Sequence, residues 1–365
     1  MTRMKADFPV RVLIVAASMD IVGGQAVQAV RLLEHLKEEP AVAVDFLPVN
    51  PRLPGVLRKL QAIKYVRTIT TSHLYWWKLL TTIPSFDVIH IFSASYFSFL
   101  LAPAPAIVVA RLFGKRIVLN YHSGEAEDHL RRWPRTSIPM LKKADEIVVP
   151  SPYLVRVFAK FGLPAKAIFN VIDFDQLIFR ERETLRPLFL SNRNFEAHYG
   201  VDVVLRAFAI IQQRFPDAAL KVAGDGPGRE MLHELAAELQ LRNVEFVGMV
   251  TRERMAELYN EADCFLNGSR VDNQPLSILE AFASGLPVVT TNAGGIPDVV
   301  TDGVTALMVE KDDHEALAHN AIALLEQPEL APRLINAGRN ECRRYTWEAV
   351  RNEWLKAYGT TNDAT

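Results

Sequence analysis

Two carboxylates in the second half of the chain, Asp272 and Glu280, flank the expected start of a helix. Pro275 suits the first turn of that helix, because the N–H group that proline lacks is not needed there. Free N–H groups and the positive end of the helix dipole favour an anion at such a place. A carboxylate repels phosphate but accepts hydrogen bonds from sugar hydroxyls. The residues together therefore indicate a site for a nucleotide sugar, although Asp272 alone could be a cap and Glu280 alone a surface residue.

The elements that must position these carboxylates can be read from residues 263–300. Glycine and proline interrupt the apolar runs in this stretch, and they mark the ends of short strands and helices. The expected elements are a strand ending at Leu266, a helix from Pro275 to Gly285, a strand at Val288–Thr291, a turn at Gly294-Gly295 and a helix from Pro297. Two helix starts thus follow two strand ends.

The whole stretch resembles the donor-binding signature of glycosyltransferase family 4, which contains retaining glycosyl transferases of group 1 with the GT-B fold. The family signature has two glutamates separated by seven residues, a helix end of small residues, and a Pro-Val-Val strand. These features correspond here to Asp272 and Glu280, to 281–285, and to 287–289. The first carboxylate is one methylene shorter than in the family. The resemblance covers most of the chain, and it is specific at 263–300 and loose before residue 140.

The resemblance implies an α/β protein with two doubly wound, parallel-sheet Rossmann-like domains that face a cleft. It implies an enzyme that moves a sugar from a nucleoside-diphosphate sugar to an acceptor with retention of configuration. Arg193 and the backbone around 273–277 would hold the diphosphate, Glu280 the ribose, and Asp272 and His122 the sugar ring. The catalytic residues expected are His122, Asp272 and Arg193. The donor-binding residues expected are Gly23, Gly24, Asn273, Gln274, Pro275, Leu276, Ser277 and Glu280.

Two sites in the first half of the chain follow expected strand ends. Gly23 and Gly24 come after the apolar run 10–17, where the family has a glycine loop near the donor phosphate. His122 follows the expected strand 116–120, and open α/β sheets bind ligands at such ends. Glu125 and Asp128 are weaker candidates for acceptor binding. The glycines could also form only a turn, and His122 could be an ordinary core residue.

One position departs from the family pattern. The family has a basic residue after the first strand of the donor domain and a lysine before the next glycine, and both charges counter the leaving diphosphate. Arg193 matches the first, but Tyr199 stands where the lysine is expected, before Gly200. Arg270 is a candidate for the missing charge.

Composition limits the remaining classes. With 365 residues, 49% hydrophobic and 23% charged, the chain is expected to form two soluble domains. We expect an acceptor-binding domain at 1–180, a donor-binding domain at 181–345, and a helix at 346–365 that returns to the first domain.

The charge differs between the two halves of the chain. Residues 1–180 carry 23 basic and 14 acidic residues, a net charge of +9, and the remaining residues carry a net charge of −10. Two cysteines provide no disulfide framework. No metal, no other cofactor and no nucleic acid partner is expected.

Residues 52–80 combine six basic residues and no acidic one with tryptophans and leucines. This composition favours an amphipathic helix on an anionic membrane, although a solvated basic face is the alternative. The acceptor would then be lipid-linked or a cell-surface glycan precursor. With no signal peptide and no apolar span, the expected location is the cytoplasm, at the inner face of the membrane.

Two other functions compete with sugar transfer. A nucleotide-sugar-binding protein without turnover would explain the departures at Asp272 and Tyr199. A GT-B nucleotide-sugar epimerase would release a free product without an acceptor. A dehydrogenase is not expected, because no expected strand is followed by the required glycine spacing and ribose-binding acid.

Overall fold

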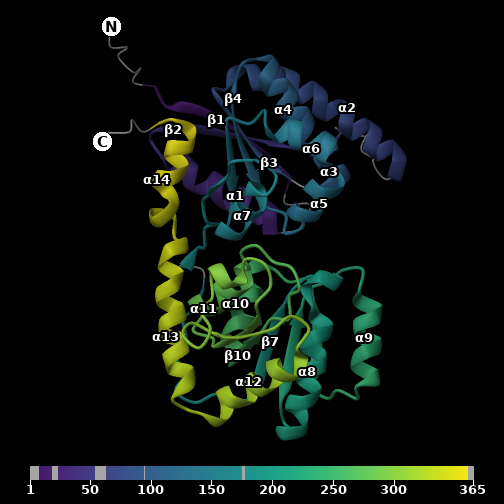
Figure 1. Cartoon of the computed structure of the whole chain (residues 1–365), viewed down its shortest axis with the longest axis vertical. Coiled ribbons are helices and arrows are strands. Elements are labelled where there is room, and N and C mark those ends of the chain that lie inside the picture. Colours follow the sequence, from purple (N-terminus) through teal and green to yellow (C-terminus); the bar gives the residue numbers. More distant parts are fainter. Residues whose placement is uncertain (1–7, 19–23, 54–62, 94, 175–176, 361–365) are drawn as a thin grey trace. The chain divides into compact units, whose positions relative to one another are not determined.

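The structure, a computed structural model, describes residues 8–18, 24–53, 63–93, 95–174 and 177–360 (Figure 1). Contacts divide the chain into two compact units. The first unit comprises Met1–Val171 and Val350–Thr365, and the second comprises Ile172–Ala349. Each unit contains one parallel sheet of six strands with helices packed on it. The expected pair of Rossmann-like domains is therefore confirmed.

The sheet of the first unit has the strand order β2-β1-β3-β4-β5-β6. Its central strands are buried on both faces, so they are continuous apolar runs, as expected for a parallel sheet covered by helices. Its strands are β1 (Val10–Ala16), β2 (Val42–Pro48), β3 (Val88–Ser93), β4 (Arg116–Tyr121), β5 (Glu146–Val149) and β6 (Lys166–Ala167).

Eight helices of the described residues cover this sheet. They are α1 (Gly24–Lys37), α2 (Lys64–Thr82), α3 (Tyr96–Leu101), α4 (Pro103–Leu112), α5 (Ala126–Arg132), α6 (Pro134–Leu141), α7 (Pro152–Ala159) and, from the end of the chain, α14 (Trp347–Tyr358). The apolar region 97–113 is divided between the two helices α3 and α4. The chain breaks at Ala102, because Pro103 cannot continue the hydrogen bonding of α3.

Helix α14 is fastened to the first unit by polar contacts along its length. Arg351 pairs with Glu39 at 2.5 Å, and the Arg116 guanidinium donates to the carbonyl oxygen of Ala357 at 2.9 Å. The Tyr358 hydroxyl bonds to the ring of His90 on β3 at 2.8 Å. The last helix is thus part of the first unit from Val350 onward.

The sheet of the second unit has the order β12-β11-β10-β7-β8-β9. Its strands are β7 (Leu188–Asn192), β8 (Ala219–Ala223), β9 (Val244–Gly248), β10 (Cys264–Leu266), β11 (Val288–Thr291) and β12 (Leu307–Val309). Its helices are α8 (Val201–Arg214), α9 (Arg229–Glu238), α10 (Arg252–Glu261), α11 (Leu276–Ala283), α12 (His314–Glu326) and α13 (Leu330–Cys342). Helices α8 and α12 pack side by side (Figure 1).

The stretch 263–300 folds largely as expected. Gly285 ends α11 with a positive φ of 72°, and β11 has the expected bounds. The helix expected from Pro297 was wrong: only a single 3₁₀ turn forms, at Ile296–Asp298. A proline in the first turn makes a helix start possible, but no apolar stripe follows here to stabilise further turns.

Candidate functional site

The strand order of the second unit locates a binding region. Strands β8 and β9 lie on one side of β7, and β10, β11 and β12 lie on the other. The chain therefore leaves β7 and β10 in opposite directions, and the loops after these two strands diverge. Open parallel sheets bind ligands at such a switch point, outside the carboxyl ends of the strands. The loops concerned are 193–200 and 267–275.

These two loops approach each other through glycine backbones. A Cβ atom on Gly200 would lie 1.8 Å from the carbonyl oxygen of Gly268, and one on Gly268 would lie 2.3 Å from the oxygen of Gly200. Gly200 also has a φ of 61°, which disfavours other residues. The pairing of loops at the switch point consequently depends on both glycines.

Arg193 and Asp272 form an ion pair between these loops. Their side chains are only 12% and 10% exposed, and Asp272 also accepts from the backbone N–H of Asn273 at 2.8 Å. Burial raises the pKa of Asp272, while the Arg193 charge and the Asn273 N–H act against that rise. The guanidinium thus favours the ionised form of a carboxyl group that has little access to water.

Tyr199 lies beside this pair. The Arg193 guanidinium carbon is 5.1 Å from the centre of the Tyr199 ring, a cation–π distance. Tyr199, which stands at the position of the family lysine, therefore packs against Arg193 and adds no second positive charge.

Arg270, the candidate for the missing charge, is bound elsewhere. Its guanidinium lies 2.7 Å from Asp202 and 2.5 Å from Asp312, and it also donates to the carbonyl oxygen of Ala197. Two carboxylates compensate its charge. In this structure Arg270 connects the start of α8 to the loop after β10, and its charge is already balanced.

The N-terminal end of α11 faces the same loops. Asn273, Gln274 and Ser277 are buried, and within the described residues the Ser277 hydroxyl has no hydrogen-bond partner. A Cβ atom on Gly295 would lie 1.8 Å from the carbonyl oxygen of Asn273, so the turn at Gly294-Gly295 packs directly under this segment. Pro275 is the N-cap residue, and Leu276 is the first helical residue.

Glu280 lies on α11 and is connected to β7 through a tyrosine. The Tyr259 hydroxyl donates to Glu280 Oε2 at 3.1 Å, and it accepts from Asn192 Nδ2 at 3.2 Å. Asn192 and Arg193 are consecutive residues, so both carboxylates of the signature are linked to the same end of β7. Tyr259 and Asn192 were not anticipated from the sequence, in which neither residue belongs to a motif.

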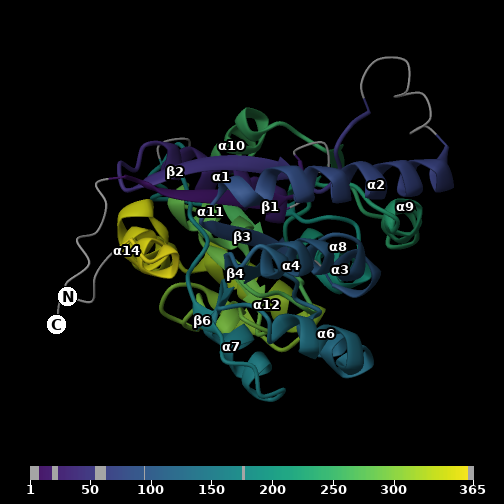
Figure 2. The same ribbon diagram turned by 90° about the horizontal axis from the view of Figure 1, so that it is seen from above.

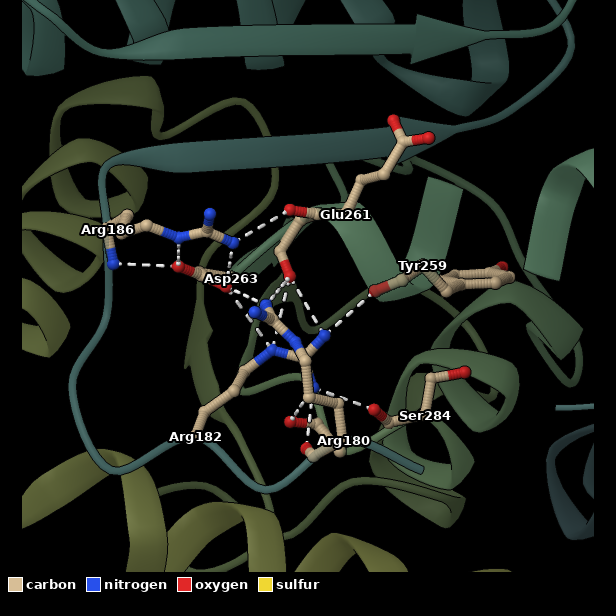
Figure 3. A network of polar contacts seen from close by, with 9 residues as sticks. Arg180, Arg182, Arg186, Tyr259, Glu261, Asp263 and Ser284 are labelled. Carbon is tan, nitrogen blue, oxygen red and sulfur yellow. Dashed lines mark hydrogen bonds and ion pairs between the residues drawn. The ribbon is translucent and has the colours of Figure 1, made fainter. Parts of the chain in front are cut away.

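An arginine cluster fastens the carboxyl ends of α10 and α11 together (Figure 3). Arg180 and Arg186 pair with the buried Asp263, which lies just before β10. Arg182 is buried and donates to five backbone oxygens: those of Arg180 (2.9 Å), Tyr259 (2.9 Å), Ala262 (2.9 Å), Ser284 (2.7 Å) and Gly285 (2.8 Å). Burial lowers its pKa to about 10. One guanidinium therefore satisfies the last carbonyl groups of two helices.

In the first unit, His122 directly follows β4 and joins a stack of rings. Its ring lies 5.1 Å from that of Phe92, which lies 4.9 Å from that of His90. Burial lowers the pKa of His122 to about 3, so the imidazole is neutral at physiological pH. His122 lines a small recess with other residues of the first unit, including Gln28, Asn120, Asn170 and Trp354.

The other candidates of the first unit differ in their surroundings. Gly23 lies outside the described residues, and Gly24 is the first residue of α1. Glu125 is exposed and precedes α5. Asp128 accepts from the Tyr96 hydroxyl at 2.5 Å and pairs with Arg132 at 3.0 Å.

The segment 52–80 is described in part. Residues 54–62, which include Arg58 and Lys59, lie outside the described residues. Helix α2 lies on the outside of the first unit in both views (Figures 1 and 2). Helix α2 buries Tyr75 and Leu79. Helices α2, α3 and α4 all expose large apolar side chains. The exposed residues are Ile69, Trp76, Trp77, Leu80, Phe97, Leu101, Val108 and Leu112.

No helix among the described residues is both long and apolar enough to span a membrane. No cluster of three or more histidine, cysteine, aspartate or glutamate side chains among them could hold a metal ion.

Comparison with known families gives two matches that together cover most of the chain. Residues 173–341 match the family described as Glycosyl transferases group 1, and residues 22–176 match Glycosyltransferase Family 4. The two halves of the chain thus match two glycosyl transferase families. Both carboxylates of the signature, the arginine after β7 and the start of α11 lie within the first of these matches.

Two curated relatives of this chain are named as transferases. The sulfoquinovosyl transferase SQD2 of Arabidopsis thaliana is 27% identical over 74% of this chain and 57% of its own length. The GDP-mannose-dependent alpha-(1-6)-phosphatidylinositol monomannoside mannosyltransferase of Mycolicibacterium smegmatis is 30% identical over 63% of this chain and 66% of its own. The chain thus spans less than two thirds of the length of either relative.

Solved structures share the fold. Anabaena Alr3699/HepE in complex with UDP and glucose has a TM-score of 0.76 at 16% identity, covering 96% of this chain and 100% of the other. Sucrose-phosphate synthase from Thermosynechococcus elongatus has a TM-score of 0.77 at 20% identity, covering 96% of this chain and 98% of the other. The expected GT-B fold is confirmed.

Proposed function

We propose that this chain transfers a sugar from a nucleoside-diphosphate sugar to an acceptor and retains the anomeric configuration. The observation that carries the proposal is the buried Arg193–Asp272 ion pair at the switch point of the second sheet, beside the start of α11. A cation, helix N–H groups and a carboxylate together suit a ligand that has both phosphates and hydroxyls. Similar structures and relatives that are named for UDP, glucose and GDP-mannose support a donor of this class.

The donor diphosphate is assigned to Arg193 and to the backbone of 273–277. The buried Ser277 hydroxyl, without a partner among the described residues, can donate a further hydrogen bond to a phosphate oxygen. Glu280 accepts from the ribose hydroxyls, and Asp272 accepts from a hydroxyl of the sugar. The neutral His122 side chain is suited to hydrogen bonding with a sugar hydroxyl, because one ring nitrogen donates while the other accepts.

In the proposed reaction the bond between the anomeric carbon and the phosphate oxygen breaks first, leaving an oxocarbenium-like centre. The acceptor oxygen then forms its bond on the same face, and its proton moves to the departing phosphate. No protein nucleophile is required. Arg193 and the helix N–H groups counter the charge that develops on the leaving diphosphate, so catalysis depends on positioning and electrostatic stabilisation. We propose that the reaction needs no metal ion.

The acceptor is proposed to be lipid-linked or a cell-surface glycan precursor. Helix α2 exposes Trp76 and Trp77, at 40% and 61%, and carries no acidic residue. Tryptophan prefers the headgroup level of a membrane, and basic side chains are attracted to anionic lipid. The exposed side chains of α2, α3 and α4 would hold the first unit on such a surface. The names of the mycobacterial relatives, which include phosphatidylinositol, agree with a lipid acceptor.

The test is a transfer assay with UDP-glucose and GDP-mannose, each offered phosphatidylinositol in anionic vesicles, with and without EDTA. We expect a glycolipid whose anomeric configuration, determined by NMR, equals that of the donor, and equal rates with EDTA. An inverted product would contradict retention, and loss of activity in EDTA would contradict metal independence. Donor binding without any turnover would favour the binding protein, and a free epimer formed without acceptor would favour the epimerase.

A further inference from the structure

A buried tyrosine joins the end of β7 to the carboxylate of α11. The Tyr259 hydroxyl lies 3.1 Å from Glu280 Oε2 and 3.3 Å from the carbonyl oxygen of Ser277, and it accepts from Asn192 Nδ2 at 3.2 Å. A phenol has only one proton to donate, and an ionised carboxylate is a stronger acceptor than a peptide carbonyl. The proton is therefore directed to Glu280.

This hydroxyl remains a donor over the whole working range of pH. Tyr259 is fully buried, and burial together with the nearby Glu280 raises its pKa well above the ordinary value of 10. The Asn192 amide occupies one lone pair of the same oxygen. The hydrogen bond to Glu280 is thus maintained by groups that do not titrate near neutral pH.

The backbone on either side of the tyrosine is also held in place. Arg182 donates to the carbonyl oxygen of Tyr259 at the end of α10 and to those of Ser284 and Gly285 at the end of α11 (Figure 3). The two helices are therefore joined at their carboxyl ends by Arg182 and at Glu280 by the tyrosine hydroxyl. Two connections at different points of the helices restrict rotation of α11 about its axis, and so restrict the direction of the Glu280 side chain.

We propose that Tyr259 is a positioning residue for ribose recognition. By orienting the Glu280 carboxylate, it enables the site to distinguish a ribonucleotide from a deoxyribonucleotide. The inference rests on the proposed function, because it takes Glu280 as the acceptor for ribose hydroxyls. Tyr259 itself is buried and does not touch the ligand.

The test compares Tyr259→Phe with the wild type. UDP, GDP and ADP are first titrated into the wild type by calorimetry, and the tightest binder is then compared with its 2′-deoxy and 3′-deoxy forms. We expect the wild type to prefer the ribonucleotide by about tenfold and Tyr259→Phe to reduce that preference about fivefold, because one hydrogen bond that orients the acceptor is lost. In the transfer assay the variant should raise the donor KM and change kcat little.

Tyr345→Phe is the matched control. Tyr345 is also fully buried in the second unit, and its hydroxyl also donates to a glutamate, Glu341, at 3.0 Å. The control should keep the wild-type preference for ribose. An unchanged preference in Tyr259→Phe, or an equal loss in both variants, would overturn the inference. Failure of the wild type to bind any of the three nucleotides would instead overturn the proposed function.

Discussion

At the carboxyl ends of its strands the second unit gathers charged and hydrogen-bonding side chains, whereas the first unit gathers aromatic rings. In the second unit, Arg193 pairs with Asp272, and Glu280 is held by a buried tyrosine. In the first unit, His122 stacks on Phe92, and burial keeps its imidazole neutral. The two sheets have the same number of strands and the same parallel arrangement.

The difference shows that a parallel sheet supplies a place for a ligand, and the loop residues supply the chemistry. A diphosphate needs compensating charge, which a buried arginine offers at small reorganisation cost. A sugar ring or an apolar acceptor needs neutral hydrogen-bonding groups and aromatic surface. This division of roles can be tested by substitutions in each unit.

Replacement of Arg193 by alanine should have the largest effect. We expect kcat/KM to fall about 10²- to 10³-fold, and the free energy of unfolding to fall by about 3 kcal/mol, because Asp272 remains buried without its partner. The folded-state pKa of Asp272 is already raised by burial, so the deficit should shrink at acidic pH, where the carboxyl group is protonated, and grow as the pH rises. Thermal melts from pH 4 to 8 measure this.

The control for this change is Arg193→Lys, which keeps a positive charge near Asp272. It should restore most of the stability and part of the activity, since lysine cannot form the same planar contacts. An Arg193→Ala variant with activity within tenfold of the wild type would show that catalysis does not require this positive charge in the second unit.

Replacement of Glu280 by alanine should weaken donor binding and leave the fold intact. The loss of a hydrogen bond to a charged group costs about 1.5–3 kcal/mol, which is about 10- to 150-fold in Kd. Calorimetry with the nucleotide measures it. Glu326→Ala, which removes a surface ion pair with Arg214, is the control and should bind as the wild type does. Unchanged affinity of Glu280→Ala would refute its role.

The exposed apolar side chains of the first unit should affect membrane binding by about tenfold. The double variant Trp77→Ala and Leu80→Ala removes large side chains that are 61% and 43% exposed; the loss of their burial should weaken binding to anionic vesicles about tenfold. Co-sedimentation at low and high salt measures it, and salt should weaken the wild type as well. Met231→Ala with Met249→Ala, exposed in the second unit, is the control. Equal binding of the wild type to neutral and anionic vesicles would contradict the membrane role of α2, which would then be an ordinary solvated helix.

Replacement of Tyr199 by lysine should have a small effect. It removes a cation–π contact of about 0.5–1 kcal/mol with Arg193 and adds the charge that the family has at this position. We expect the kcat/KM of the variant to stay within about fivefold of the wild-type value or to exceed that value. Tyr199→Phe, which keeps the ring, should behave as the wild type. Complete inactivity of a folded Tyr199→Lys variant would mean that the tyrosine has become essential to the site.

His122 should give no titration at all near neutral pH. Its pKa is lowered to about 3, so its ring signals in NMR spectra should stay constant from pH 8 to 5. A histidine with a lowered folded-state pKa binds a proton more readily when unfolded, so it destabilises the fold as the pH falls from about 6.5 toward 3. His122→Gln should therefore lose less stability in acid than the wild type. A midpoint near 6.5 would contradict a ring that stays neutral.

The sequence by itself determined the regular elements and their type. The strand Val288–Thr291 has the bounds expected from its apolar run, and Gly285 ends α11 as expected from its position. These features are local, because hydrophobic periodicity, proline and glycine act within a few residues. The strand β12 (Leu307–Val309) was not anticipated from the sequence.

Only the tertiary structure decided which side chains meet. Arg193 and Asp272 are 79 residues apart in the chain, and Tyr259 and Glu280 are 21 apart, so no local pattern connects either pair. The same holds for Arg270, whose charge was a candidate for the site and is bound by Asp202 and Asp312. The physical reason is that partners are selected by the close approach of loops, and this approach depends on the strand order and on Gly200 and Gly268, whose backbones touch only after the sheet has formed.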